Sequence, residues 1–174
     1  MIKVIAFDLV GVLVTEKDVD LTKEQARLER LFDAYDDPIN NEASLLRIED
    51  IKQATLDIFS KLYEIKNPLL FQELRDKYPG IKIVIASNHV SYIMDYLKSN
   101  FNPDNIYLSS LIGIAKPNKE YFQYILDKEK ILPSELLFLD DKERNINNSS
   151  ELGINTIKVN KDTNLLEEIN KFMI

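Results

Sequence analysis

Acidic side chains and one lysine follow apolar runs at separate places in the sequence. Asp8 comes after the first run, Lys116 lies in the loop after the third, and Asp140 and Asp141 come after the fourth. Carboxylate oxygens suit Mg²⁺, which usually takes a few of them together with waters and a substrate phosphate. A lysine beside them would offset the negative charge and stabilise charge on a transferring phosphoryl group. These residue types are therefore suited to binding a divalent cation and a phosphate.

Three smaller residues lie beside this set. Ser87 and Asn88 follow the second apolar run, and the Ser87 hydroxyl could donate to phosphate oxygens, as could the backbone N–H groups after Asp8. Gly11 would let that backbone approach a ligand closely. Considered one at a time, such residues are more often turn formers or helix caps. Their joint placement after the apolar runs is what favours a common site.

Five short apolar runs predict the strands that position these side chains. They are rich in Ile, Val, Leu and aromatic residues, and several are apolar on both faces, as in parallel strands covered by helices. The runs are 2–7, 81–86, 105–109, 135–140 and 155–159.

Segments of helical period separate and follow these runs. They are 69–80, 92–101, 118–130, 144–153 and 164–173, and we expect Gly80 and Gly153 to terminate two of them. Alternating strands and helices predict an α/β fold with a parallel sheet flanked by helices. Ligands bind outside the carboxyl ends of such strands. The candidate residues should therefore meet in one crevice.

Residues 15–65 break the alternation. They show no strand-like run, only helical stretches at 21–35 and 44–63 joined by the turn-rich 36–41. We expect an inserted helical cap at 15–65 and a core formed by 1–14 and 66–174. The cap's regularly spaced apolar residues should form its own packing and its contact with the core; they are Leu28, Leu31, Phe32, Leu56, Phe59 and Tyr63. Arg47 could reach the crevice, and we expect His89 to be partly exposed.

Composition narrows the possible partners. The 22 basic and 29 acidic side chains give a net charge of −7, which argues against nucleic acid or an anionic membrane as partner. The absence of cysteine excludes disulfides and thiolate metal sites. The N-terminus does not resemble a signal peptide, and no run approaches the length of a membrane span. We expect a cytoplasmic protein that is a monomer or a weak dimer.

Four segments resemble, in order and spacing, the signature motifs of the haloacid dehalogenase-like hydrolase superfamily. They are FDLVGVLV, IVIASN, GIAKPNKEYF and LLFLDDKERNINNSSELGINTI. The resemblance covers the strands and loops of a Rossmann-like core, and 15–65 resembles the small helical cap inserted after the first strand in that family. The branch it resembles most includes sugar-1-phosphate phosphatases and regions related to the N-terminal domain of epoxide hydrolases.

The resemblance implies a Mg²⁺-dependent phosphatase of a small phosphorylated metabolite. Asp8 would be the nucleophile that forms an aspartyl-phosphate. Ser87 would bind phosphoryl oxygens with Asn88 beside it, and Lys116 would be the lysine of the third motif. The implied metal ligands come from the first and fourth motifs; they are Asp8, the backbone carbonyl of Val10, Asp140 and Asp141.

Val10 departs from the family pattern. Most phosphatases of the family carry a second Asp there, which protonates the leaving oxygen and later activates water. Such acid–base catalysis typically contributes about 10²- to 10⁴-fold. A better leaving group, or a cap acid such as Glu16 or Asp18, could compensate. Alternatively, the protein is a catalytically weakened member that binds a phosphorylated ligand or a partner.

Two further reactions of the family also proceed without that second acid. Dehalogenation needs no magnesium, and the acidic pair Asp140 and Asp141 argues against it. Phosphonate hydrolysis would need a reactive cap lysine near the site. The candidates are Lys17, Lys23, Lys52 and Lys61, for which surface solvation is the simpler explanation.

Overall fold

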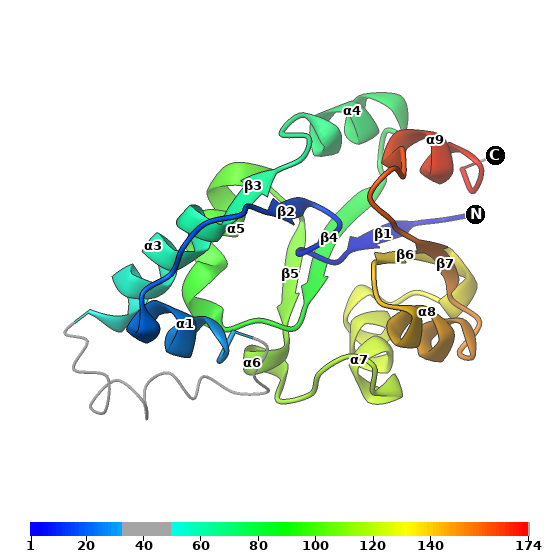
Figure 1. The fold of residues 1–174 in the computed structure, drawn as a ribbon. Helices are drawn as coiled ribbons and strands as arrows, with labels where there is room; N and C mark the ends of the chain where they lie inside the picture. Colours follow the sequence, from blue (N-terminus) through cyan, green and yellow to red (C-terminus); the bar gives the residue numbers. More distant parts are fainter. Residues whose placement is uncertain (33–49, 174) are drawn as a thin grey trace.

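Five parallel strands form the centre of the molecule. The computed structural model describes residues 1–32 and 50–173 (Figure 1). The strand order is β5 (Asn105–Leu108), β4 (Lys82–Ser87), β1 (Val4–Phe7), β6 (Leu136–Asp140) and β7 (Asn155–Lys158). All five predicted runs form strands, so the α/β fold with a parallel sheet is confirmed.

Helices cover both faces of this sheet. α4 (Leu70–Lys77), α5 (Met94–Phe101) and α9 (Leu165–Asn170) contribute to one apolar cluster, and α7 (Lys119–Glu129) and α8 (Glu143–Ser150) to the other. Figure 1 shows α4 and α9 on the opposite side of the sheet from α7 and α8. Alternate residues of β1 enter the two clusters, as the two-residue period of a strand requires. Short helices complete the connections: η1 (Ser91–Ile93), α6 (Ser109–Ile112) and η2 (Pro133–Glu135).

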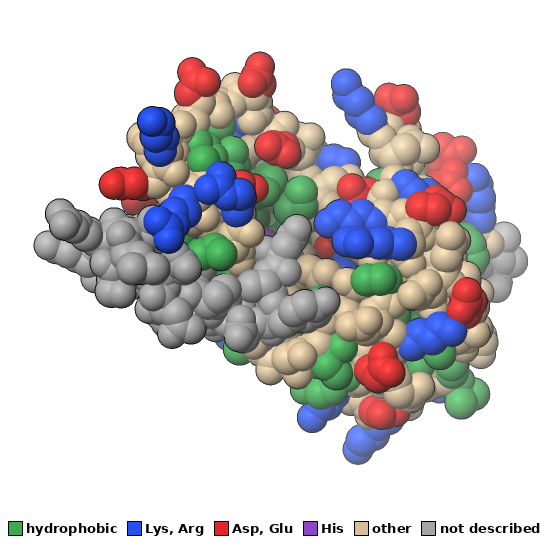
Figure 2. Space-filling view, turned by 60° about the horizontal axis from the view of Figure 1, so that its bottom comes forward, with side chains coloured by type: hydrophobic (Ala, Val, Ile, Leu, Met, Phe, Trp, Pro, Cys, Tyr) green, Lys and Arg blue, Asp and Glu red, His purple; other side chains and the backbone are tan. Residues whose placement is uncertain are grey.

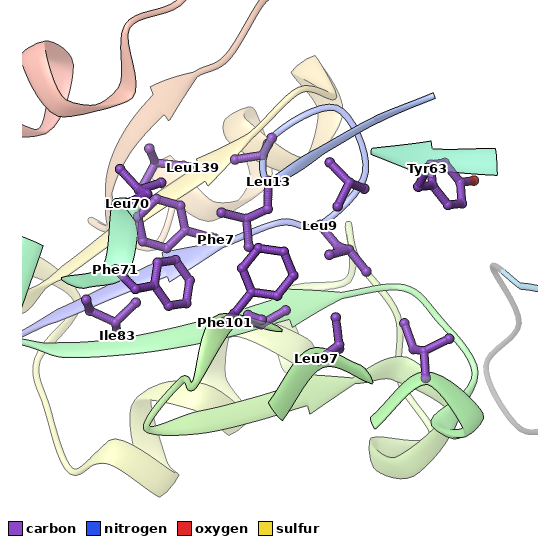
Figure 3. Packing of buried hydrophobic residues seen from close by; sticks show 14 of the residues in the cluster. Phe7, Leu9, Leu13, Tyr63, Leu70, Phe71, Ile83, Leu97, Phe101 and Leu139 are labelled. Carbon is purple, nitrogen blue, oxygen red and sulfur yellow. The ribbon is translucent and has the colours of Figure 1, made fainter. Parts of the chain in front are cut away.

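Phenylalanines in tilted ring contacts support the end of β1. The ring of Phe7 lies 5.2 Å from that of Phe71 in α4, and Phe71 lies 5.7 Å from Phe101 in α5, measured between centroids. Figure 3 shows these side chains packed with Leu70, Ile83 and other aliphatic residues. Because Phe7 is fully buried, the residue that follows it has a rigid support.

Both glycines expected to terminate helices lie beyond the observed helix ends. α4 ends at Lys77, and the N–H of the capping residue Tyr78 donates to Leu74. Pro79 follows Tyr78, and a residue before proline is disfavoured in the helical conformation, which explains the earlier end. α8 ends at Ser150. Gly80 and Gly153 have φ of +89° and +84° in the turns that follow these helices.

A short antiparallel ribbon forms at the two ends of segment 15–65, called the insertion below. The prediction of no strand there is therefore wrong. β2 (Val14–Glu16) pairs with β3 (Tyr63–Ile65), with Val14 opposite Ile65 and Glu16 opposite Tyr63. Strands of three residues are too short to leave a periodic signal. The proposed boundary of the cap at 14/15 falls inside β2, and the one at 65/66 directly follows the last residue of β3.

Two described helices belong to the insertion. α1 (Lys23–Glu29) begins with a capping box between Thr22 and Gln25, and α3 (Ile51–Leu62) begins at Asp50. The predicted apolar cap residues are all packed in or against the larger cluster. Phe59 of α3 contacts the Tyr96 ring of α5 at 5.1 Å, which fixes this helix against the core. Arg47 and the 36–41 turn lie outside the described residues. Within the described helices, none has the length and apolar character needed to cross a membrane.

A buried carboxylate ties the amino ends of two strands to α7. Glu129 accepts hydrogen bonds from Tyr107 at 2.5 Å, Asn105 at 2.6 Å and Lys82 at 3.0 Å. Burial alone would raise the pKa of Glu129, but these three donors outweigh it and the pKa is lowered. The ionised carboxylate therefore stabilises the fold at neutral pH.

We expect Glu129→Gln to lower the free energy of unfolding by about 1 to 3 kcal/mol at pH 7. Because the folded-state pKa is depressed, the stabilisation is present above the unfolded pKa and is lost as pH falls through the lower folded value. The difference between wild type and variant should thus shrink as pH falls below about 4.5, the ordinary value. Urea unfolding from pH 3 to 7 measures it, and a pH-independent difference would contradict this account.

Candidate active site

The register of the sheet places two of the predicted acids side by side. β1 lies between β4 and β6, and Phe7 pairs with Leu139 of β6. Asp8 and Asp140 come next, and the N–H of Asp8 donates to the carbonyl of Leu139 over 2.9 Å. Because the strands are parallel, both acids lie at the carboxyl edge of the sheet. Ser87, the last residue of β4, lies at the same edge and is buried.

Lys116 joins these strands from the loop between α6 and α7. Its side chain is 1% exposed, and Nζ lies 2.9 Å from Asp8 Oδ1 and 2.7 Å from Asp140 Oδ2. The same ammonium donates to the carbonyl of Ala86 over 2.8 Å. Burial would lower the pKa of Lys116, but the charges of Asp8 and Asp140 outweigh it and the pKa is raised. Lys116 therefore stays protonated and offsets part of the buried negative charge.

The Asp8 carboxylate is held through one of its oxygens. Oδ1 accepts from the N–H of Leu9 at 2.8 Å and from Lys116. Burial raises the pKa of Asp8 to about 6, although the charge of Lys116 opposes the rise; the charge of Asp140 adds to it. Asp8 is thus ionised at neutral pH. Within residues 1–32 and 50–173, no hydrogen bond engages Oδ2, so this oxygen remains for reaction with a ligand.

Asp140 is fully buried and bonded through both oxygens. Oδ1 accepts from the N–H of Lys142 at 2.7 Å, and the amide of Asn145 lies 3.0 Å from Oδ1 and 2.9 Å from Oδ2. Asn145, in α8, is a site residue that the sequence reasoning missed. Its one signal is an amide on the helix face turned toward the sheet, which is weak in a segment rich in asparagine.

The three acids form a cluster that fits a divalent cation. One oxygen from each of Asp8, Asp140 and Asp141 lies within 4.8 Å of the others. In the described part of the chain, Asp141 Oδ1 is buried and has no hydrogen-bond partner. A buried carboxylate oxygen without a donor is available to bind a cation, and an all-oxygen set is what Mg²⁺ prefers. The donor chemistry of this edge therefore fits Mg²⁺.

Gly11 makes room for one of these acids. Its φ is +83°, and a Cβ at this position would lie 2.6 Å from Asp141 Oδ2. Any other residue would displace the carboxylate or strain the loop. Lys66 and Lys158 support the same region, donating to the carbonyls of Gly11 at 2.6 Å and of Asp141 at 2.5 Å.

A cavity of about 320 Å³ opens beside Val10. Residues from the insertion and the core line it together: Val10, Glu29, Arg30, Phe32, Tyr63, His89 and Lys142. Figure 2 shows lysine and arginine side chains on both sides of a hollow that contains hydrophobic groups. Glu16 and Asp18, the cap acids that could compensate for the missing Asp, are exposed and do not line this cavity. The four candidate cap lysines do not line it either.

His89 is buried, so the expectation of partial exposure is wrong. It is 2% exposed, and its ring lies 4.8 Å from Phe32 and 5.5 Å from Phe59. Both phenylalanines belong to the insertion, which covers the loop after β4. Because a segment distant in the sequence buries His89, the residues next to it in the sequence do not indicate this burial.

Asn88 uses its side chain within the protein. Nδ2 donates to the carbonyl of Lys116 at 2.8 Å, and Oδ1 accepts from the N–H of Lys116 at 2.9 Å. The loops that carry Asn88 and Lys116 are thereby joined. A role of Asn88 in binding phosphate stays a prediction.

Among curated proteins, the chain is similar to D-ribitol-5-phosphate phosphatase of Bacteroides thetaiotaomicron, at 28% identity over 71% of this chain and 63% of that protein. It is also similar to mouse bifunctional epoxide hydrolase 2, at 27% identity over 62% of this chain and 21% of that protein. The chain thus spans less than two thirds of the length of these relatives.

Solved structures share the whole fold. A haloacid dehalogenase-family enzyme of Bacteroides thetaiotaomicron, solved as a mutant with magnesium and inorganic phosphate, superposes with a TM-score of 0.75 at 21% identity, over 97% of this chain and 99% of that one. A predicted hydrolase of Porphyromonas gingivalis gives 0.72 at 23% identity, over 99% and 98%. The family model for haloacid dehalogenase-like hydrolases matches residues 5–159, so this chain belongs to that family.

Proposed function

We propose that the chain is a Mg²⁺-dependent phosphohydrolase of a small phosphorylated metabolite and acts through an aspartyl-phosphate on Asp8. The observation that carries this proposal is the arrangement of Asp8, Lys116 and Asp140 at one sheet edge, with Asp141 Oδ1 buried and without a donor. The phosphatase relative and the neighbour solved with magnesium and phosphate support it. The Val10 cavity, at about 320 Å³, is suited to a small organic group.

Each residue has a defined task in this reaction. Oδ2 of Asp8 attacks phosphorus and forms a new P–O bond, while the bond from phosphorus to the substrate oxygen breaks. That oxygen leaves with the bonding electron pair and takes up a proton from water. The ammonium of Lys116 holds Asp8 in place and offsets negative charge on the phosphoryl oxygens. The hydroxyl of Ser87 donates to one of those oxygens. Water then attacks the same phosphorus, which releases phosphate and restores the Asp8 carboxylate.

The metal would be held by three acids and one carbonyl. The proposed ligands are Asp8, Asp140 and Asp141, directly or through water, and the carbonyl of Val10. Bound Mg²⁺ supplies positive charge that orients the phosphate and stabilises its transition state. Asn145 and the N–H of Lys142 keep Asp140 oriented for this role.

Metal removal tests the function directly. Phosphatase activity should appear in a panel of phosphorylated sugars, polyols, nucleotides and glycolate-like acids with Mg²⁺ present. Treatment with EDTA should reduce it to background, and added Mg²⁺ should restore it, since three closely spaced acids need a cation to approach an anionic phosphate. Activity that is indifferent to EDTA would contradict the metal assignment. Inactivity on the whole panel would contradict the proposed function.

The valine at position 10 motivates a second candidate, a protein that binds a phosphorylated ligand or a partner with little turnover. Val10→Asp separates the two. We expect wild type to cleave a nitroaryl phosphate, whose leaving group departs without a proton. Val10→Asp should match its rate of aryl release in a single turnover within about threefold, because the water-activating role of an Asp there belongs to the later hydrolysis step. For an alkyl phosphate the variant should be faster by about 10²-fold, the lower range for an added general acid.

Other outcomes of the Val10→Asp experiment are equally informative. Turnover in the variant alone, on both substrates, would favour the binding protein. Equal rates on the alkyl phosphate would mean that another acid already supplies the proton. Glu29, which lines the same cavity as Val10, is then the residue to replace by Gln.

A further inference from the structure

The side-chain amide of Asn88 forms hydrogen bonds to the Lys116 backbone through both Nδ2 and Oδ1. The two hydrogen bonds, 2.8 Å to the carbonyl and 2.9 Å from the N–H, join residues 28 positions apart. An asparagine amide places a donor and an acceptor side by side, so it can pair with the C=O and N–H of one residue as a residue of a neighbouring strand would. Each polar atom of the Asn88 side chain therefore has a partner on the Lys116 backbone.

These two hydrogen bonds fix the backbone of Lys116, which does not lie in a strand. Lys116 lies in the loop between α6 and α7, yet its Nζ must reach Asp8, Asp140 and the carbonyl of Ala86 within 2.7 to 2.9 Å. A lysine side chain has several rotatable bonds, so the position of its ammonium depends on where its backbone is held. Ala86 and Asn88 come from the same strand end. Residues at the carboxyl end of β4 thus hold both the backbone and the ammonium group of Lys116.

A second amide supports the same loop from the other side. Nδ2 of Asn148 in α8 donates to the carbonyl of Pro117 at 3.0 Å. This bond restrains the residue after Lys116, whereas Asn88 restrains Lys116 itself. The Asn88 contact is therefore the more direct determinant of the ammonium position.

We infer that the side chain of Asn88 positions Lys116 and does not itself bind the phosphate. The inference rests on the proposed function, since it assigns Lys116 a task in phosphoryl transfer. Asn88 acts on the reaction through the lysine, so its loss should change the rate and leave phosphate binding in place.

The test compares turnover with phosphate binding in Asn88→Ala. We expect kcat to fall about 10- to 100-fold, because a small misplacement of a catalytic group lowers the rate by up to that factor. The inhibition constant of inorganic phosphate should stay within about twofold of wild type. In a Lys116→Met background, Asn88→Ala should lower kcat by less than about twofold, because the residue it positions is already gone. Asn88→Ser, a smaller loss of packing, serves if the alanine variant does not fold.

A matched control separates positioning from general loss of stability. Asn155 also donates from its side chain to a backbone carbonyl, that of Ser134 at 2.8 Å, at the amino end of β6. Asn155→Ala should leave kcat unchanged. The inference is overturned if Asn88→Ala weakens phosphate inhibition tenfold at constant kcat, if it leaves both unchanged, or if its full effect persists without Lys116. Inactive wild type would instead reject the proposed function.

Discussion

Asp8→Asn is expected to lower kcat by at least about 10⁴-fold, the scale seen when a nucleophile is removed. The amide has nearly the shape of the carboxylate but cannot attack phosphorus. Wild type quenched during turnover should carry a covalent phosphate detectable by mass spectrometry of the intact protein, and the variant should carry none. Steady-state assays with Mg²⁺ and a substrate from the panel measure the loss.

The Asp8→Asn variant should remain folded. Burial raises the pKa of Asp8 to about 6, so the ionised side chain is held in an unfavourable environment, and a neutral replacement should be at least as stable. Asp76→Asn is the matched control, because Asp76 is an exposed acid of α4 and its variant should retain full activity. Residual activity above about 1% in a folded Asp8→Asn protein would remove Asp8 from the role of nucleophile.

The sheet and the position of Asp8 could be predicted because their signals are local. Runs of buried β-formers marked all five strands, and the rule that ligands bind at carboxyl ends placed Asp8, Ser87 and Asp140 at one edge. The structure brings Asp8 and Asp140 together through the strand register. The loop after the third run likewise brings Lys116 to this edge, and a lysine among acids is expected to pair with them, as it does with Asp8 and Asp140.

The remaining features depend on contacts between distant segments. The ribbon of β2 and β3 has three residues a strand and forms because the two ends of the insertion meet. The amide of Asn88 pairs with a backbone unit 28 residues away, and no periodicity records such a bond. Glu29 reaches the cavity beside Val10 by tertiary packing of α1. Local sequence patterns therefore predict strands and helices better than they predict which distant segments are joined by hydrogen bonds or packing.

Lys116→Met should be the most destabilising change at the site. The lysine lies 2.9 Å from Asp8 and 2.7 Å from Asp140, and all three side chains are buried. Removal of one partner from a buried ionic cluster leaves uncompensated charge and lowers the free energy of unfolding by about 3 to 5 kcal/mol. The rate should fall by about 10²- to 10³-fold as well, because a positive charge near the phosphoryl oxygens is lost.

Two conditions should offset the loss of stability in Lys116→Met, and each identifies electrostatic repulsion as its cause. A carboxylate with a raised folded-state pKa favours folding at low pH and loses that contribution as pH rises through the folded value. Without the lysine the pKa of Asp8 rises further, so the variant should approach wild-type stability as pH falls toward about 6, the value in wild type. Added Mg²⁺ should raise its melting temperature more than that of wild type.

Lys119→Met is the matched control that shows how much of the lost stability is due to the burial of the Lys116 ion pairs. Lys119 pairs with Glu151 at 2.6 Å, but its side chain is 47% exposed. An exposed ion pair contributes at most about 1 kcal/mol, so this variant should unfold within that margin of wild type and keep its activity. Thermal unfolding with EDTA and with Mg²⁺ at pH 5 and 8 gives all these values. If Lys116→Met were as stable as Lys119→Met at pH 8 in EDTA, Lys116 would not be the counter-ion of the buried acids.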